Sequence, residues 1–180
     1  SPIKIGNMEV KNRIQFSPMV SSLSTPTGGV SQELLGYIKY QAQSGVGVIT
    51  IGSTPIDHIN GVDFFGALDV TSDDNMTDLR RISEVVHRYG AKVSCELVHA
   101  GRSAPKQFRP HSPAIAPSAI PVDNGPTDIR EMDEKDMETI RKEYCDVAER
   151  LMKSGFDMVM VHAAHGNLLA QFMSPKYNQR

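Results

Sequence analysis

Residues 155–180 decide the fold and read GFDMVMVHAAHGNLLAQFMSPKYNQR. Within this stretch, Met158–Val161 is a continuous apolar run, which is typical of a strand buried on both faces. The run leads directly into His162 and His165, which two alanines separate. Imidazoles at the end of a buried strand are costly unless they meet a ligand, a metal or polar partners. We therefore expect this strand end to belong to a functional site that the rest of the chain positions.

The preceding sequence repeats one unit, in which an amphipathic helix ends at a glycine and an apolar strand follows. We expect helices over 31–44, over 74–89 and from 133 onward, glycine ends at Gly45, Gly90 and Gly155, and strands over 46–51, 92–98 and 158–161. A first strand is expected over 13–17, after a small hairpin that begins near residue 4. Strands that alternate with helices predict right-handed βαβ units and a parallel sheet.

Four parallel strands leave two architectures open, an open doubly wound sheet and half of a closed barrel. No glycine-rich phosphate loop of the GxGxxG kind follows any expected strand, which argues against a dinucleotide-binding open sheet. A barrel closes with eight strands, so this chain supplies half of one at most. A proline-rich stretch between Gly101 and Met132 follows the third barrel strand, at the sheet edge where α/β active sites lie.

Composition excludes several classes of protein. The 180 residues carry a net charge of −2, so no basic field is present to recruit nucleic acid. Cys95 and Cys145 are too few for a disulfide scaffold and lack the spacing of a metal site. The sequence shows no signal-peptide pattern and no long apolar run, so we expect a cytoplasmic protein without a membrane partner.

Three strand-end motifs together resemble one enzyme family. Residues 11–19 read KNRIQFSPM, residues 96–102 read ELVHAGR, and the third motif begins at His162. In this order they resemble the first, third and fourth barrel strands of the Old Yellow Enzyme family of FMN-dependent oxidoreductases, and the branch of 2,4-dienoyl-CoA and bile-acid-inducible enoate reductases is nearest. The resemblance implies the N-terminal half of a (β/α)8 TIM barrel over residues 1–180, with an N-terminal hairpin and a long loop after strand three. The remainder of the barrel is absent from this chain.

The resemblance also implies roles for individual residues. The residues expected to contact FMN are Pro18, Met19, Val20, Ser53 and Glu96. His162 and His165 match the catalytic pair that binds the carbonyl oxygen of the substrate, where they would stabilise the negative charge that develops during reduction. From the residues alone this pair also suits a metal or a structural role, but no nearby Asp, Glu or Cys completes a ligand set, so we expect no metal.

Two positions depart from the pattern of the family. Glu96 stands where the family has a glutamine that bonds the pyrimidine edge of the flavin, so its carboxyl is either protonated in a desolvated site or paired with a cation. Asn167 stands where many members have a tyrosine that donates a proton, and an amide is not a useful general acid. Two further residues stay open: His99 has either a functional role or a backbone hydrogen bond, and Arg102 contacts either the ligand or a surface acid.

The resulting hypothesis is an FMN-dependent reductase of the activated C=C bonds of enones or enoyl thioesters, with NADH or NADPH as reductant and a homo-oligomeric assembly. The dienoyl-CoA reductase resemblance implies a possible iron–sulfur cluster and FAD in the missing C-terminal region. One alternative is a non-catalytic flavin- or ligand-binding half-barrel, and another is a self-contained four-stranded α/β protein. Because barrels of this type build their phosphate site after strands seven and eight, we expect the isolated chain to be inactive and to bind FMN weakly.

Overall fold

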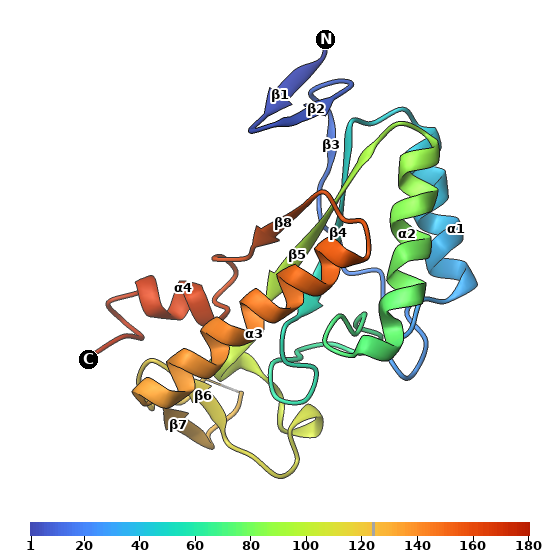
Figure 1. Ribbon diagram of the computed structural model, residues 1–180. Coiled ribbons are helices and arrows are strands. Elements are labelled where there is room, and N and C mark those ends of the chain that lie inside the picture. Colours follow the sequence, from blue (N-terminus) through green and yellow to red (C-terminus); the bar gives the residue numbers. More distant parts are fainter. Residues whose placement is uncertain (124) are drawn as a thin grey trace.

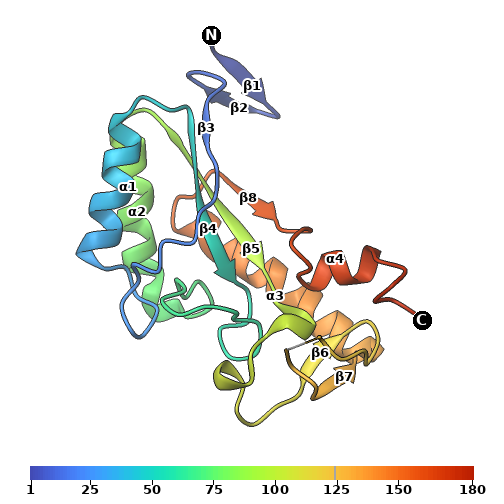
Figure 2. The same cartoon turned by 180° about the vertical axis from the view of Figure 1, so that it is seen from behind.

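A computed structural model describes residues 1–123 and 125–180 as a small hairpin joined to a four-stranded parallel sheet (Figure 1). The hairpin pairs β1 (Ile3–Ile5) with β2 (Met8–Val10) in antiparallel register, as predicted. It lies beside the ends at which the sheet strands begin (Figure 2). Lys11 Nζ donates to the carbonyl of Tyr89 at 2.7 Å and fastens the hairpin there.

The main sheet has the spatial order β3-β4-β5-β8, with every pair parallel. Its strands are β3 (Gln15–Phe16), β4 (Val48–Pro55), β5 (Lys92–Val98) and β8 (Met158–Val161). The spatial order follows the chain order, whereas a doubly wound sheet reverses direction at a switch point. The sheet is therefore wound in one direction, as in a barrel.

Three long helices cover one face of this sheet. They are α1 (Gln32–Gln43), α2 (Met76–Arg88) and α3 (Glu134–Lys153), and the short α4 (Leu168–Met173) follows β8. Side-chain caps begin two of these helices: Ser31 Oγ accepts the N–H of Leu34 at 2.9 Å, and Asp133 and Asp136 form a reciprocal capping box. No helix in the described part of the chain combines the length and apolar character needed to cross a bilayer.

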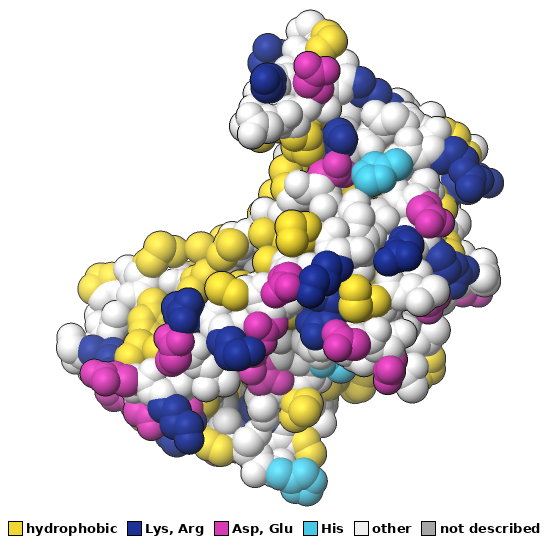
Figure 3. All heavy atoms as spheres, in the orientation of Figure 1, with side chains coloured by type: hydrophobic (Ala, Val, Ile, Leu, Met, Phe, Trp, Pro, Cys, Tyr) yellow, Lys and Arg dark blue, Asp and Glu magenta, His cyan; other side chains and the backbone are white. Residues whose placement is uncertain are grey.

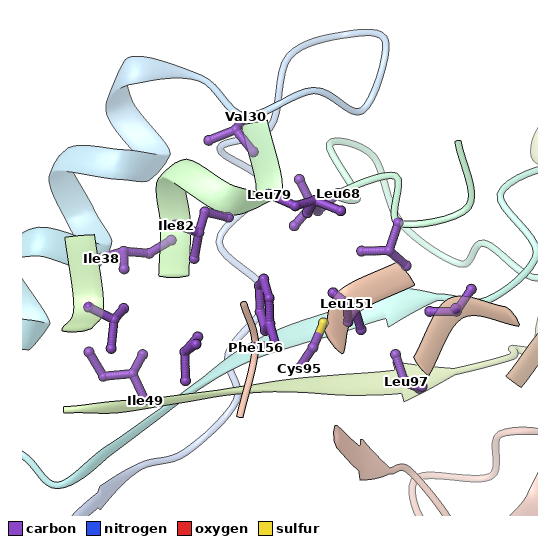
Figure 4. Close-up of a cluster of buried hydrophobic side chains, with 14 of the residues drawn as sticks. Val30, Ile38, Ile49, Leu68, Leu79, Ile82, Cys95, Leu97, Leu151 and Phe156 are labelled. Atoms are coloured by element: carbon purple, nitrogen blue, oxygen red, sulfur yellow. The ribbon is translucent and has the colours of Figure 1, made fainter. Parts of the chain in front are cut away.

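The hydrophobic core lies between the sheet and these helices (Figure 4). Side chains alternate along a strand, so β5 sends Val93, Cys95 and Leu97 into the core. The same alternation sends Ser94 and Glu96 to the opposite face of the sheet. The pattern of β5 thus separates packing residues from residues that are free to form a site.

Two strands differ from their predictions. The strand expected over 46–51 runs from Val48 to Pro55, and its register against β5 shifts between Ile51 and Thr54. Gly52 and Ser53 therefore lie inside the strand, although glycine usually signals a strand end. The first strand is shorter than expected, because β3 comprises only Gln15–Phe16.

The prediction that Met158–Val161 is buried on both faces is wrong for this chain. The strand forms at the expected residues, but it lies at the edge of the sheet, and Val159 and Val161 are 37% and 53% exposed. Hydrophobic side chains gather on the molecular surface over the region of β8 and α4 (Figure 3). The apolar run thus marks a strand suited to the interior of a larger sheet, while its burial depends on what covers it.

The described part of the proline-rich stretch after β5 contains regular structure. It contains two short parallel strands, β6 (Ala114–Ala116) and β7 (Ile129–Glu131). The fully buried guanidinium of Arg109 binds both carboxylate oxygens of Asp128 at 2.8 and 2.9 Å, which closes this segment on itself. The described residues also include 3-10 turns at Asp73–Asn75, Gly101–Ser103 and Lys106–Phe108.

Truncating the core side chain of α3 should test this packing. Leu151 is fully buried, so Leu151→Ala should lower the free energy of unfolding by about 2–5 kcal/mol, because a cavity replaces the lost contacts. The neighbouring Met152 is 66% exposed, and Met152→Ala should change the stability little. Urea denaturation of both variants measures the difference, and equal losses would contradict the assigned core face.

Candidate active site

A cavity of about 390 Å³ opens at the carboxyl ends of the sheet strands. Six of the seven residues predicted from the sequence line it: Pro18, Val20, Ser53, Glu96, His162 and His165. Asn167 also lines the cavity, as do Asp63 and Phe64 from the segment after β4. The carboxyl ends of parallel strands meet at one edge, and this geometry brings together residues that are far apart in the sequence.

The seventh predicted residue, Met19, does not line this cavity. Its backbone bridges to Gly52, and its side chain lines a small neighbouring pocket with Tyr37 of α1. The Met19 side chain is nevertheless 57% exposed at the first strand end, next to Pro18 and Val20. Its contact with a flavin stays a prediction.

A chain of three polar side chains crosses the cavity wall. His162 Nδ1 lies 2.9 Å from Glu96 Oε1, and His162 Nε2 lies 3.1 Å from His165 Nδ1. The carboxyl of Glu96 is almost fully buried, and the His162 ring lies against it. Of the two possibilities for Glu96, the structure places an imidazole where the pairing partner is needed.

The backbone is unusual at two positions beside Glu96, His162 and His165. A Cβ atom on Gly52 would lie 2.8 Å from Glu96 Oε2 and 2.7 Å from Pro18 Cβ, so only glycine lets these side chains approach. His165 has a φ of 53°, in the left-handed region that few non-glycine residues occupy. Such backbone strain is concentrated at functional sites.

His99 turns away from the cavity and forms the backbone bond that was one of its two predicted alternatives. It is 1% exposed, and its Nδ1 accepts the N–H of Gly101 at 3.0 Å. Burial lowers the pKa of His99 to about 4, although the nearby carboxylate of Asp57, 3.9 Å from Nε2, acts in the opposite direction. A neutral His99 therefore supports the turn after β5.

Arg102 does not line this cavity, and among the described residues it has no acidic partner, so its contact with a ligand stays a prediction. It is buried, it donates to the carbonyl of Pro121, and its guanidinium lies 4.1 Å from the ring centre of Tyr177. Its backbone N–H donates to Gln171 Oε1 at 3.1 Å. Arg102 thus ties the segment after β5 to α4, a role that only the tertiary structure reveals.

Sequence reasoning missed Asp63 and Phe64. Both lie in the segment that follows β4 at the active edge of the sheet, and that position was the available signal. Burial raises the pKa of Asp63, while its own backbone N–H and His162 lower it by smaller amounts. The cavity therefore holds a second carboxyl group beside Glu96, in different surroundings.

The donor set of the cavity fits the ring end of FMN. Pro18 and Val20 provide an apolar wall for a flat ring, and Ser53 and Glu96 offer polar groups for its edge. Gly52 leaves this wall in place, because a side chain at position 52 would displace Pro18 or Glu96. Among the described residues, no group of three or more His, Cys, Asp or Glu side chains is arranged to hold a metal ion.

Comparison with known proteins gives a consistent result. The model of the NADH:flavin oxidoreductase / NADH oxidase family matches residues 1–180. The NADH oxidase of Thermoanaerobacter brockii is 35% identical over 177 residues, which are 98% of this chain and 27% of that protein. The NADH:acrylate oxidoreductase of Vibrio harveyi is 34% identical over 176 residues, which are 96% of this chain and 17% of that protein.

A solved structure supports the predicted architecture. The Old Yellow Enzyme of Pichia sp. AKU4542 is 30% identical and superposes with a TM-score of 0.90 over 99% of this chain and 49% of that one. The chain thus spans half or less of the length of the proteins compared here. The half-barrel prediction is confirmed by this likeness together with the singly wound sheet.

The buried His99 predicts a dependence of stability on pH. Its pKa is about 4 in the folded chain against 6.5 ordinarily, so between these values the unfolded chain binds more protons. The free energy of unfolding should therefore fall as the pH is lowered from about 6.5 to about 4. NMR titration of the ring should give a His99 pKa near 4, and His99→Gln should weaken the pH dependence. A His99 pKa near its ordinary value would contradict the described burial.

Proposed function

Because the chain belongs to the NADH:flavin oxidoreductase / NADH oxidase family, we propose that it contributes the substrate-binding half of an FMN-dependent reductase. The proposed substrates are the activated C=C bonds of enones or enoyl thioesters, and the reductant is NADH or NADPH. The observation that carries the proposal is the chain Glu96–His162–His165 along one cavity wall. The relative named NADH:acrylate oxidoreductase supports this class, because acrylate is an α,β-unsaturated acid.

FMN, when bound, relays a hydride from the reduced nicotinamide to the β-carbon of the substrate. The residues expected to hold its ring are Pro18, Val20, Ser53 and Glu96. The task of the histidine pair is to bind the substrate carbonyl oxygen, which gains negative charge as the β-carbon is reduced. Donors placed for that charge lower the barrier more than donors placed for the neutral carbonyl.

The contact between the two rings shows how the pair donates. When Nε2 of His162 carries a hydrogen, it donates to His165 Nδ1. This arrangement leaves Nε2–H of His165 free to donate to a carbonyl oxygen. The almost fully buried carboxyl of Glu96 lies 2.9 Å from the other ring nitrogen of His162, Nδ1.

A second candidate function is a flavin- or ligand-binding module without catalysis. Asn167 favours it, because the amide cannot serve as the proton donor in the position where it lines the cavity. Turnover of NAD(P)H with an enone by the full-length protein distinguishes the two. Flavin that binds but is not reoxidised by any enone would support the binding module.

The double variant His162→Ala/His165→Ala tests the role of the pair. FMN should stay bound, since the ring contacts lie elsewhere, but reoxidation by an enone should slow by about a hundredfold or more, the usual cost of lost oxyanion donors. Stopped-flow absorbance of the flavin measures both half-reactions. Loss of FMN with no selective effect on the enone step would show that the pair is structural.

Glu96→Gln tests the charge beside the ring. Glutamine has nearly the same size and shape as glutamate, so the fold and FMN binding should persist. Removing a negative charge near the ring should raise the reduction potential of the bound flavin, because that charge opposes reduction. A spectroelectrochemical titration of both proteins measures the shift. An unchanged potential would mean that the Glu96 carboxyl is neutral or turned away from the ring.

A further inference from the structure

The proposed reduction needs a proton as well as a hydride, and Asn167 cannot supply it. We propose that Asp63 is the general acid that protonates the α-carbon of the substrate. The inference rests on the proposed function and deepens it, because it names the proton donor of the same site. It starts from position: Asp63 lines the cavity that also holds His162, His165 and Asn167.

The other titratable groups of the cavity wall are already engaged with one another. Four such side chains line it among the described residues: Asp63, Glu96, His162 and His165. Three of them form one continuous chain, with separations of 2.9 and 3.1 Å. A proton given up by this chain would remove the charge that the carbonyl oxygen needs at that moment. Asp63 lies outside the chain and is free to lose a proton without that cost.

The segment that carries Asp63 is fixed at its first end by the turn after β5. A Cβ atom on Gly61 would lie 2.7 Å from His99 Cδ2, so the backbone is pressed against that buried ring. The carbonyl of Gly61 accepts the N–H of Ala100 at 2.9 Å. Val62, directly before Asp63, is 5% exposed. The buried, neutral His99 therefore supports the segment that carries Asp63.

The second end of the segment is fixed as firmly. Gly66 has a φ of 72°, and a Cβ atom there would lie 2.8 Å from the carbonyl oxygen of Ser22. The ring of Phe65 packs edge-on against Phe108, with centroids 4.7 Å apart. Asp63 therefore stands on a segment that is held on both sides. Preorganisation of this kind is what a group in proton transfer requires.

The surroundings of Asp63 raise its pKa above the ordinary value for an aspartate. Its neighbours on the cavity wall include the apolar side chains of Phe64, Pro18 and Val20. Burial raises the pKa of Asp63, and the opposing effects of its own backbone N–H and of His162 are smaller. A carboxyl group that keeps its proton nearer to neutral pH is better suited to general-acid catalysis.

The step balances as follows. NAD(P)H supplies the electron pair, which reaches the β-carbon as hydride, and the C=C π bond breaks. The O–H bond of Asp63 breaks while a C–H bond forms at the α-carbon. The carboxylate of Asp63 then recovers a proton from solvent. The sum is one alkene, one NAD(P)H and one proton converted to one saturated product and one NAD(P)+.

The test compares Asp63→Asn with wild type in the full-length, FMN-loaded protein, using cyclohexenone, NAD(P)H and dioxygen as probes. Reoxidation by the enone should slow by about a hundredfold, the lower range for loss of a general acid. Reduction by NAD(P)H and reoxidation by dioxygen should be unchanged, because neither protonates a carbon. Asp63→Glu should recover much of the enone rate. The exposed Asp74→Asn is the matched control and should behave as wild type.

A second readout does not depend on turnover. Carbon-13 NMR of the aspartate carboxyls, with the Asp63 signal identified by its loss in Asp63→Asn, should give a pKa above the ordinary value of 3.8. An enone rate unchanged in Asp63→Asn, an equal slowing with dioxygen, or an Asp63 pKa at or below the ordinary value would each overturn the proposal. Wild-type protein that reoxidises with dioxygen but with no enone would instead overturn the proposed function, and the acid role with it.

Discussion

The contact between the buried carboxyl of Glu96 and the ring of His162 is the interaction on which the site depends. A buried carboxyl without a partner is costly. β5 can place Glu96 in the cavity wall because the residue after β8, His162, brings its Nδ1 to 2.9 Å from Glu96 Oε1. The parallel pairing of the two strands, with Glu96 opposite Met160, sets that distance. The register of β5 against β8 therefore also sets the distance between the two polar groups of the site.

Glycines make room for this contact and for the segments around it. Gly52 lets Pro18 and Glu96 approach across β4, and Gly61 lets the segment after β4 lie against His99. Gly101 has the same function beside Gln171, because a Cβ atom on Gly101 would overlap with Oε1 of Gln171. The site is thus built from close backbone approaches as much as from reactive side chains, and such approaches suit glycine alone.

Two side chains support the cavity without lining it. His99 and Arg102 both belong to the ELVHAGR motif, yet the structure uses them for the turn after β5 and for its attachment to α4. Their polar atoms serve backbone groups and an aromatic ring. A motif that resembles an active site therefore contains positioning residues as well as residues that contact ligands.

The sequence by itself determined the parallel sheet, the three long helices and six of the residues that line the cavity, because periodicity and strand-end motifs are local signals. It could not show that Glu96 pairs with His162, that Arg102 faces Tyr177 or that Asp63 shares their cavity. Those facts depend on which segments meet when strands align and loops pack. The exposure of Val161 on β8 shows the same limit, since an apolar run reveals what a strand is suited to contact, while only the tertiary structure decides what it does contact.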